Sequence, residues 1–393
     1  MDKRLYLLGL GAFCVSTVAF VFSGVLPLIS ESTGIPIANV GALVAVYSLS
    51  YAIGTPILSA IAGTYNRRSV LLVGMATFVL GNLMIAASAT VPLLFLAQMG
   101  TGMAAGLFAA TAQAIAVQLA GPEHRARAIS VVVGGTTFAV ALGAPLGTFF
   151  AHMLGWRETF VGIGLVGILC VVALRLWLPD NLSGSRLSLA TRVGVIRRPG
   201  VFRALSVTFL YLAGGFSLIS YLGPLAIDGV GLPRDILPVV MLAYGVGAIA
   251  GNYTSGRLTD RLGAKRVVVT AIMASIVFAV VLSAVARFVP DAIAGPLLIG
   301  MMLAWGFVGW IFPPAQTSRL VALAPDVAHL TLALNGSAIY LGIAAGTFVG
   351  GRVLALASVN ELGLVAALFA LVALTLLLTG PGRRVEVNVP APG

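Results

Sequence analysis

The segment at residues 142–150 reads LGAPLGTFF, and nearly the same pattern returns at 341–349 as LGIAAGTFV. Each copy lies in a long apolar run and carries two glycines four residues apart, which share one face of a helix. Glycine, and the proline in the first copy, are poor helix formers in water. Their presence in an apolar run therefore needs a reason, which the rest of the chain supplies.

The composition is that of a membrane protein. Of 393 residues, 59% are hydrophobic and only 9% are charged, against roughly 25% charged residues in an average soluble domain. Apolar runs of about 18 or more residues predict membrane-spanning helices. Twelve such runs lie at 5–29, 39–62, 69–88, 92–119, 127–153, 158–178, 202–226, 236–257, 266–286, 292–315, 329–354 and 360–379. Since alternating strand patterns are absent, we predict an all-α membrane protein of twelve transmembrane helices.

Several kinds of site are not indicated by the sequence. The first run follows Lys3 and Arg4, as in a signal peptide, but it is too long for one, and we expect it to be retained as the first span. Cys14 and Cys170 lie inside spans and predict no disulfide. The histidines lack metal-ligand spacing, and no GxxxxGK[ST] loop is present. We therefore predict no enzyme, no metal and no bound cofactor, with a proton gradient as the possible energy source.

The positive charges predict the orientation of the chain. Of the 23 lysines and arginines, only Arg157, Arg234, Arg287 and Arg352 fall on the side of the membrane opposite the two termini. Cytoplasmic loops are the ones enriched in positive charge, so both termini are predicted to be cytoplasmic. This placement also explains the net charge of +11 without a nucleic-acid partner. We expect a bacterial inner-membrane protein that acts as a monomer in the lipid bilayer.

The chain is divided into two similar halves. We predict a six-helix bundle over 1–178, a cytoplasmic linker over 179–201, a second six-helix bundle over 202–380 and a cytoplasmic tail over 381–393. The two LGxxxGTF copies occupy the fifth span of each half, 199 residues apart. Such duplication predicts two pseudo-symmetric bundles with a substrate site between them, near the middle of the membrane.

Three stretches carry a resemblance to a known family. GRLTDRLGAKR at 256–266 resembles the signature loop of the major facilitator superfamily. GAPLGTFFAHMLGWRETF at 143–160 is similar to the fifth-span motif of that superfamily's drug and sugar efflux branch, and 324–351 is similar to the eleventh span of sugar or chloramphenicol-type exporters. The resemblance implies a proton antiporter that exports a small neutral or amphipathic solute by alternating access. An uncoupled facilitator or uptake carrier, and more remotely a membrane sensor or scaffold, are the alternatives.

The resemblance assigns conformational roles to two groups of residues. In the fifth and eleventh spans these are Gly143, Pro145, Gly147, Gly342 and Gly346. Small residues allow close helix contact, and Pro145 should bend the fifth span at the contact between the halves, whereas the eleventh should be straighter. Simple packing is the alternative. In the signature loop at 256–266, the residues with an implied conformational role are Gly256, Asp260, Arg261, Gly263, Lys265 and Arg266. There Asp260 either locks one conformation or lies among charges that only fix topology.

The first half departs from the family pattern in two places. In the loop between spans two and three, Gly63 stands where the acid is expected and Asn66 where a glycine is expected, so only Arg67 and Arg68 remain. In span four, Gln98 stands where the family has a buried arginine. The usual contact of the first loop is therefore in doubt.

Candidate substrate-binding residues are the polar and aromatic residues at mid-depth of the spans that line the cavity in the family. They are Tyr47, Tyr51, Gln98, Gln113, Tyr211, Tyr221, Tyr244, Asn252, Trp305, Trp310, Asn335 and Tyr340. Aromatic rings and amides suit a small-molecule substrate with both apolar and hydroxyl character. Each residue has an alternative role, at the membrane interface or in joining helices.

Acidic residues are absent from the middle of every span, where a proton relay usually lies. The acids nearest to the expected cavity are Glu31 and Asp228, at matching ends of spans one and seven. They are the candidates for proton coupling. The alternative is that both are solvated loop acids.

Overall fold

The computed structural model describes residues 2–121, 124–182, 184 and 194–379. Within this part of the chain every regular element is a helix, and twelve helical segments are long and apolar enough to span a membrane. The predicted fold class is confirmed. Residues 183 and 185–193 of the predicted linker, and the predicted tail, lie outside the described residues.

The first six spans alternate in direction and are joined by short turns. They are α1 (Arg4–Thr33), α2 with α3 (Ile37–Val40, Ala42–Ile61), α4 (Arg67–Ala87), α5 (Val91–Ala120), α6 with η3 and α7 (Arg125–Phe138, Ala139–Gly143, Ala144–Leu154) and α8 (Trp156–Trp177). A 3₁₀ turn, η1 (Ala62–Thr64), follows α3. Gly155 joins α7 to α8 with φ of 118°, a conformation that favours glycine.

The last six spans repeat this layout. They are α10 with α11 and η4 (Val201–Ile219, Leu222–Pro224, Leu225–Gly229), η5 with α12 (Arg234–Ile236, Leu237–Leu262), α13 (Ala264–Phe288), α14 (Asp291–Leu323), α15 (Ala328–Leu356) and α16 (Leu362–Leu378). Short 3₁₀ turns, η6 (Pro325–Val327) and η7 (Val359–Glu361), precede α15 and α16. We call the end of the molecule at which α1 begins and α16 ends the proximal end, and the opposite end the distal end.

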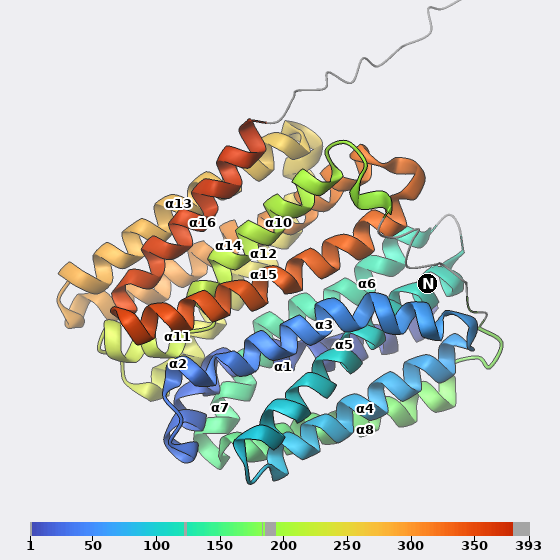
Figure 1. Ribbon diagram of the computed structural model, residues 1–393, viewed down its shortest axis with the longest axis horizontal. Helices are drawn as coiled ribbons and strands as arrows, with labels where there is room; N and C mark the ends of the chain where they lie inside the picture. Colours follow the sequence, from blue (N-terminus) through green and yellow to red (C-terminus); the bar gives the residue numbers. More distant parts are fainter. Residues whose placement is uncertain (1, 122–123, 183, 185–193, 380–393) are drawn as a thin grey trace, which may run out of the picture.

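The two groups of six helices form two bundles that lie side by side (Figure 1). In the first bundle α3 and α4 both pack on α5, α1 packs on α6, and α4 packs on α8. In the second bundle the equivalent pairs recur: α12 and α13 on α14, α10 on α15, and α13 on α16. The repeat read from the sequence therefore corresponds to a repeat of helix contacts.

The repeated glycines explain one of these contacts. A Cβ atom on Gly143 or Gly147 would lie 2.3 Å from Thr17 Oγ1 or 2.4 Å from Val21 Cγ2, both on α1. In the second half, Gly342 and Gly346 approach the backbone of α10 in the same way. The glycine face of span five therefore packs inside its own bundle, and not between the halves as the sequence suggested.

The other side of span five meets the second half. There Val140 and Ala141 lie against Gly245 of α12, and Thr148 Oγ1 lies 3.1 Å from the Met241 sulfur. A π-helical turn, η3, stands just before Pro145. Span five is thus interrupted by a π-helical turn, while α15 of the second half runs as one α-helix, and the bend at Pro145 stays a prediction.

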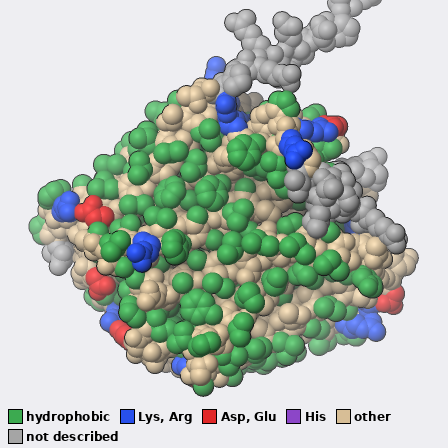
Figure 2. Space-filling model, viewed as in Figure 1, with side chains coloured by type: hydrophobic (Ala, Val, Ile, Leu, Met, Phe, Trp, Pro, Cys, Tyr) green, Lys and Arg blue, Asp and Glu red, His purple; other side chains and the backbone are tan. Residues whose placement is uncertain are grey.

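The surface matches a lipid environment. Large apolar side chains are exposed along the sides of the bundles, for example Leu169 (69%), Val277 (63%) and Leu368 (61%). Figure 2 shows a broad hydrophobic surface whose charged side chains gather near its margins. Lipid tails are the solvent that such a surface requires.

Candidate functional site

A small cavity lies between the two bundles. Its walls are Phe20 and Ser23 of α1, Val140 and Ala144 of span five, Ile219 and Leu222 of span seven, and Met241 and Tyr244 of α12. All eight side chains are uncharged. The free space is enough for about one water molecule.

Aromatic side chains continue the cavity wall. The Trp310 indole N–H donates to the Tyr244 hydroxyl at 3.2 Å, which fixes both rings. Phe20 of the first half lies 6.5 Å from Trp310 and 6.1 Å from Phe216, measured between ring centroids. Rings from both halves therefore meet at one place, in an arrangement that suits an apolar or amphipathic molecule.

A second aromatic contact joins the halves between α3 and α15. The rings of Tyr51 and Tyr340 stack with a centroid distance of 3.5 Å and an interplanar angle of 16°. One turn further along, Ser337 donates a hydrogen bond to the carbonyl of Ala52 at 3.1 Å. On the other side of the molecule, the Asn252 amide donates to Thr137 Oγ1 at 3.3 Å. Of the twelve candidates, Tyr51, Tyr244, Asn252, Trp310 and Tyr340 therefore lie at the contact between the halves, and a sixth, Tyr221, meets the first half at the distal end.

Three candidates of the first half are placed elsewhere. The Tyr47 hydroxyl donates to the carbonyl of Val15 at 3.2 Å, which joins α3 to α1 within the first bundle. Gln98 is fully buried, and its amide has no hydrogen-bond partner in the described part of the chain. Gln113 is exposed on α5.

Two candidates of the second half join helices inside that bundle. The Tyr211 hydroxyl lies 2.9 Å from Ser275 Oγ, and its ring stacks on Phe312 at 3.9 Å. Asn335 accepts a hydrogen bond from Thr208 at 2.9 Å. Thr208 in turn accepts one from the fully buried Gln316 at 3.1 Å.

The remaining two aromatic candidates do not line the cavity. Trp305 stacks on Phe278 of α13, with ring centroids 5.1 Å apart, and lies 5.5 Å from Tyr244. Tyr221 is fully buried near the distal end, where its hydroxyl donates to the carbonyl of Thr347 at 2.9 Å.

The halves are joined at their distal ends by an ion pair and by close backbone contacts. Arg234 of η5 binds Glu31 of α1 at 2.5 Å, with both side chains about half exposed. A Cβ on Gly41 would lie 1.9 Å from the Tyr221 hydroxyl, and one on Gly351 would lie 2.6 Å from the carbonyl oxygen of Ala38. We call this set of residues the distal contact.

The two candidates for proton coupling have different surroundings. Glu31 is half of the ion pair in the distal contact. Asp228, in the π-helical turn η4, is exposed and makes no ion pair within the described residues. The two acids occupy matching spans, but within the described residues only Glu31 forms an ion pair with the opposite half.

The signature loop of the second half lies at the proximal end. Gly256, Asp260 and Arg261 lie at the end of α12, Gly263 forms the turn with φ of 82°, and Lys265 and Arg266 begin α13. All six residues are exposed. Over the described ranges, Asp260 has no ion-pair partner, so the proposed lock is not engaged in this conformation.

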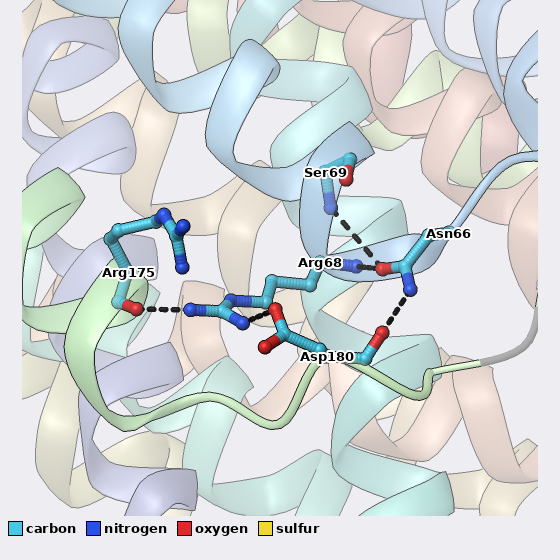
Figure 3. A network of polar contacts seen from close by, with 5 residues as sticks. All are labelled: Asn66, Arg68, Ser69, Arg175 and Asp180. Carbon is cyan, nitrogen blue, oxygen red and sulfur yellow. Dashed lines mark hydrogen bonds and ion pairs between the residues drawn. The ribbon is translucent and has the colours of Figure 1, made fainter.

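In the corresponding loop of the first half, an acid from another part of the chain takes the place of the missing one (Figure 3). Asn66 caps α4 by accepting from the backbone N–H of Arg68 at 2.9 Å, and its amide donates to the carbonyl of Asp180. The buried Arg68 guanidinium pairs with the Asp180 carboxylate and donates to the carbonyl of Arg175. The acid missing from the loop itself is thus supplied by the chain just after span six.

The start of the second half is fixed by a similar pair. Arg198 binds both carboxylate oxygens of Asp326, at 2.6 and 2.7 Å. The Arg198 guanidinium holds the pKa of Asp326 below its ordinary value of 3.8. The segment that connects the bundles is therefore anchored at one end to α4, through Asp180, and at the other end to the turn before α15.

Sequence reasoning missed several residues of the cavity and its surroundings. Phe20, Met241 and Ile219 line the cavity, but apolar residues in an apolar span give no signal of their own. Asp180 could have been paired with Arg68, because the turns after spans two and six lie at the same end of the bundle.

Twelve spans in two like bundles, with an uncharged cavity at their junction, define a multi-pass membrane protein of the transporter class. The family model of the Major Facilitator Superfamily matches residues 8–347. The chain belongs to this superfamily, whose members are membrane transporters that bind small molecules.

Individual relatives agree with this assignment. The chain is 29% identical over 384 residues to the uncharacterized MFS-type transporter YbcL of Bacillus subtilis (strain 168), covering 97% of each chain. It is 28% identical over 387 residues to the uncharacterized MFS-type transporter YtbD of the same organism, covering 96% and 95%.

Solved structures agree in fold. A crystal structure of a D-xylose-proton symporter matches with a TM-score of 0.79 at 15% identity, over 96% of this chain and 97% of that one. A bacterial homolog of the human lysosomal transporter Spinster, in an inward-facing and occupied conformation, matches with a TM-score of 0.74 at 17% identity, over 95% of each chain.

Proposed function

We propose that this protein exports a small neutral or amphipathic solute, such as a sugar or a drug, across the inner membrane of a bacterium. The two bundles, taken as 1–178 and 202–380, would rock about the central cavity so that it opens to one side of the membrane at a time. The protein would work as a monomer, and proton antiport would drive export.

The observation that carries this proposal is the uncharged aromatic junction between the halves. Tyr51 and Tyr340 meet there, and so do Phe20, Tyr244 and Trp310. Rings with hydroxyl or indole N–H groups offer apolar surface and single hydrogen bonds, which suits a neutral solute with few polar groups. A solute with a full charge would find no counter-charge among the cavity residues.

The positive charges support an orientation with both termini in the cytoplasm. The distal contact would then face the outside, and its ion pair would be part of an outer gate that is closed in this structure. The bacterial relatives support the inner membrane as the location.

Two alternatives remain in the proposal. An uncoupled facilitator or uptake carrier would have the same fold and cavity, and differs only in its response to a proton gradient. A non-transporting sensor or scaffold would have the same fold but would show no counterflow of any solute.

The test begins with substrate discovery. Sugars, nucleosides and antibiotics are screened for thermal stabilisation of the purified full-length protein, since a ligand that binds only the folded state raises its melting temperature. Each hit is then tested for counterflow in proteoliposomes, with and without a pH gradient. Gradient-driven accumulation supports the antiporter, counterflow that ignores the gradient supports the facilitator, and counterflow by no hit contradicts transport of this solute class.

Variants connect the activity to the site. Tyr51→Ala removes the ring that stacks on Tyr340 and should weaken substrate binding about tenfold or more, whereas Tyr51→Phe should keep most of the affinity. Tyr253→Ala is the matched control, because this tyrosine of α12 is 66% exposed. Equal effects at Tyr51 and Tyr253 would argue against the aromatic contact between α3 and α15 as part of the binding site.

A further inference from the structure

A proline inside α3 leaves one backbone carbonyl of that helix without its usual partner. Pro56 stands in the interior of α3 and has no N–H, so it cannot donate to the carbonyl of Ala52, four residues earlier. Ala52 is buried near the middle of the helix. An unpaired carbonyl in such a place is costly, because neither water nor lipid satisfies it. The carbonyl therefore needs a donor from another element.

The donor comes from the other half of the molecule. Ser337 of α15 donates its hydroxyl hydrogen to the Ala52 carbonyl at 3.1 Å. A hydroxyl on a helix commonly bonds to a carbonyl of its own helix, as Thr55 does with Tyr51 at 2.6 Å in α3. Ser337 instead forms its bond across the junction. This hydrogen bond therefore exists only while α3 and α15 are in contact.

Aromatic surface and a second small cavity lie on either side of this bond. Toward the distal end, the rings of Tyr51 and Tyr340 stack at 3.5 Å. Toward the proximal end, the cavity has a volume of about 20 Å³. Its walls are uncharged and are formed by Thr55, Pro56, Leu330, Ala333, Leu334 and Ser337. One hydrogen-bond acceptor is thus surrounded by apolar and aromatic surface, which suits a neutral solute with a donor group.

We propose that the Ala52 carbonyl is a substrate subsite for a hydroxyl or N–H group of a neutral solute, and that Ser337 occupies this subsite while the halves are in contact. When α3 and α15 separate, the carbonyl loses Ser337, and Pro56 has no N–H to replace it. A solute that enters then meets a free acceptor beside the Tyr51 ring. When the contact forms again, the Ser337 hydroxyl competes for the same carbonyl and favours release of the solute.

This inference rests on the proposed function and narrows its substrate class. A carbonyl only accepts hydrogen bonds, so the solute needs at least one donor group. The matching helix of the second half, α12, has no proline beyond its first turn, and its contact with the first half uses the side chains of Asn252 and Thr137. A freed backbone acceptor is therefore a property of α3 alone in this pair, which gives the solute one preferred orientation.

Two small probes of similar size test the need for a donor. In para-fluorophenol an O–H group is present, whereas in para-fluoroanisole a methyl group replaces its hydrogen. Binding of each probe to the full-length protein in nanodiscs is measured by fluorine NMR, and empty nanodiscs give the partition into lipid that is subtracted. We expect the wild type to bind para-fluorophenol about fivefold or more tightly than para-fluoroanisole, as one hydrogen bond allows.

Two substitutions should change the binding of the donor in opposite directions. Ser337→Ala removes the competing hydroxyl and should strengthen the binding of para-fluorophenol about threefold, without changing that of para-fluoroanisole. Pro56→Ala supplies a backbone N–H that bonds to Ala52, so the two probes should then bind to within about twofold of each other. Ser206→Ala is the matched control, because the Ser206 hydroxyl donates to Phe202 within its own helix. This variant should bind both probes like the wild type.

Three results would overturn the proposal. They are equal binding of the two probes by the wild type, a donor preference that Pro56→Ala leaves unchanged, and weaker binding of para-fluorophenol by Ser337→Ala. Melting temperatures close to that of the wild type show that the variants are folded. Because the readout is binding alone, a donor preference that follows both substitutions without transport of any solute would contradict only the proposed function. Transport without a donor preference would contradict only this inference.

Discussion

Gly245 determines how closely α12 can approach span five. A Cβ at this position would lie 2.4 Å from the Cα of Ala141 and 2.9 Å from the carbonyl oxygen of Val140. These are backbone atoms of the other half, so they cannot turn away as a flexible side chain could. The contact between the halves at this point depends on the absence of a side chain.

Gly245→Ala should shift the protein away from the conformation described here. Overpacking costs about 1–3 kcal/mol, which corresponds to a roughly 5- to 150-fold change in the ratio of two states. Distance measurements between distal labels would show the gain of longer distances. Gly134→Ala is the control, since Gly134 lies on span five itself with no atom within 4 Å. If Gly245→Ala and Gly134→Ala gave the same distance distribution, the two helices would accommodate the added methyl group without a cost in free energy.

The sequence predicted which residues could form the site, but not which way they face. Tyr51, Tyr340 and Trp310 are at the junction of the halves, whereas Tyr211 and Asn335 point into their own bundle. In an apolar span, both faces are hydrophobic, so periodicity does not reveal the rotation of the helix. Packing against the neighbouring helices fixes that rotation, so it could not be predicted from the hydrophobic pattern of one sequence.

Span five is the element whose geometry departs most from a regular helix near the cavity. Pro145 has no N–H, and in a regular helix its ring would clash with the carbonyl four residues earlier, that of Ala141. The π-helical turn over Ala139–Gly143 adds the room that this ring requires. The same turn presents Ala141 to Gly245, so the proline and the contact between the halves are linked.

Pro145→Ala should therefore reduce transport more than stability. Without the proline, the turn can relax to a regular helix, which rotates the residues on one side of it by about 100°. We expect transport to fall several-fold while the melting temperature stays within a few degrees. Pro296→Ala, in α14, serves as the comparison. A variant that transports and melts like the wild type would mean that Pro145 has no conformational role.

The pair between Arg198 and Asp326 makes stability depend on pH in a defined direction. Because the pKa of Asp326 is lower in the folded protein than its ordinary value of 3.8, the pair stabilises the fold above that pH. The contribution is lost as the pH falls through the lowered value, since the folded protein must then take up the proton.

Asp326→Asn should lower the melting temperature slightly, and by the same amount, at pH 5 to 8. Both partners are well exposed, so the effect is small. The difference from the wild type should begin to shrink below about pH 4, where the unfolded carboxyl takes up its proton, and should vanish only once the pH is below the lowered pKa of the folded protein. Asp260→Asn is the control, because Asp260 is exposed without an ion pair in the described segments. A difference that persists undiminished in acid would contradict the assignment.

Helices were easier to predict than their irregularities. Twelve apolar runs predicted twelve spans, because length and hydropathy suffice for this. The π-helical turns at 139–143 and 225–229 were not predicted, since they depend on a change of hydrogen-bond partner by one residue. The ion pair of Arg68 with Asp180, which replaces an acid in the loop itself, was also not predicted. The two residues are more than one hundred positions apart in the sequence.

At the scale of the whole molecule, the charge distribution predicts which end faces the cytoplasm. A cysteine replacing Ser358 should react with an impermeant maleimide added to intact cells, whereas one replacing Thr379 should not, although both positions are exposed. The measurement uses a background without Cys14 and Cys170, and permeabilised cells confirm that Thr379→Cys can react. Labelling of Thr379→Cys in intact cells would reverse the orientation, and with it the direction of export.

The glycines of the distal contact have a consequence for the speed of the cycle. Gly41 and Gly351 have no side chain where they bring the halves together against Tyr221 and the carbonyl of Ala38, so they add little apolar area to the surface that separates on opening. Water hydrates exposed carbonyl groups readily, whereas newly exposed apolar area costs about 25 cal/mol per Å². If large apolar side chains formed this contact, a broad apolar surface would be exposed to water each time the halves separate. Glycines at the contact expose little apolar surface on opening. The closed and open forms can therefore remain close in free energy and exchange quickly.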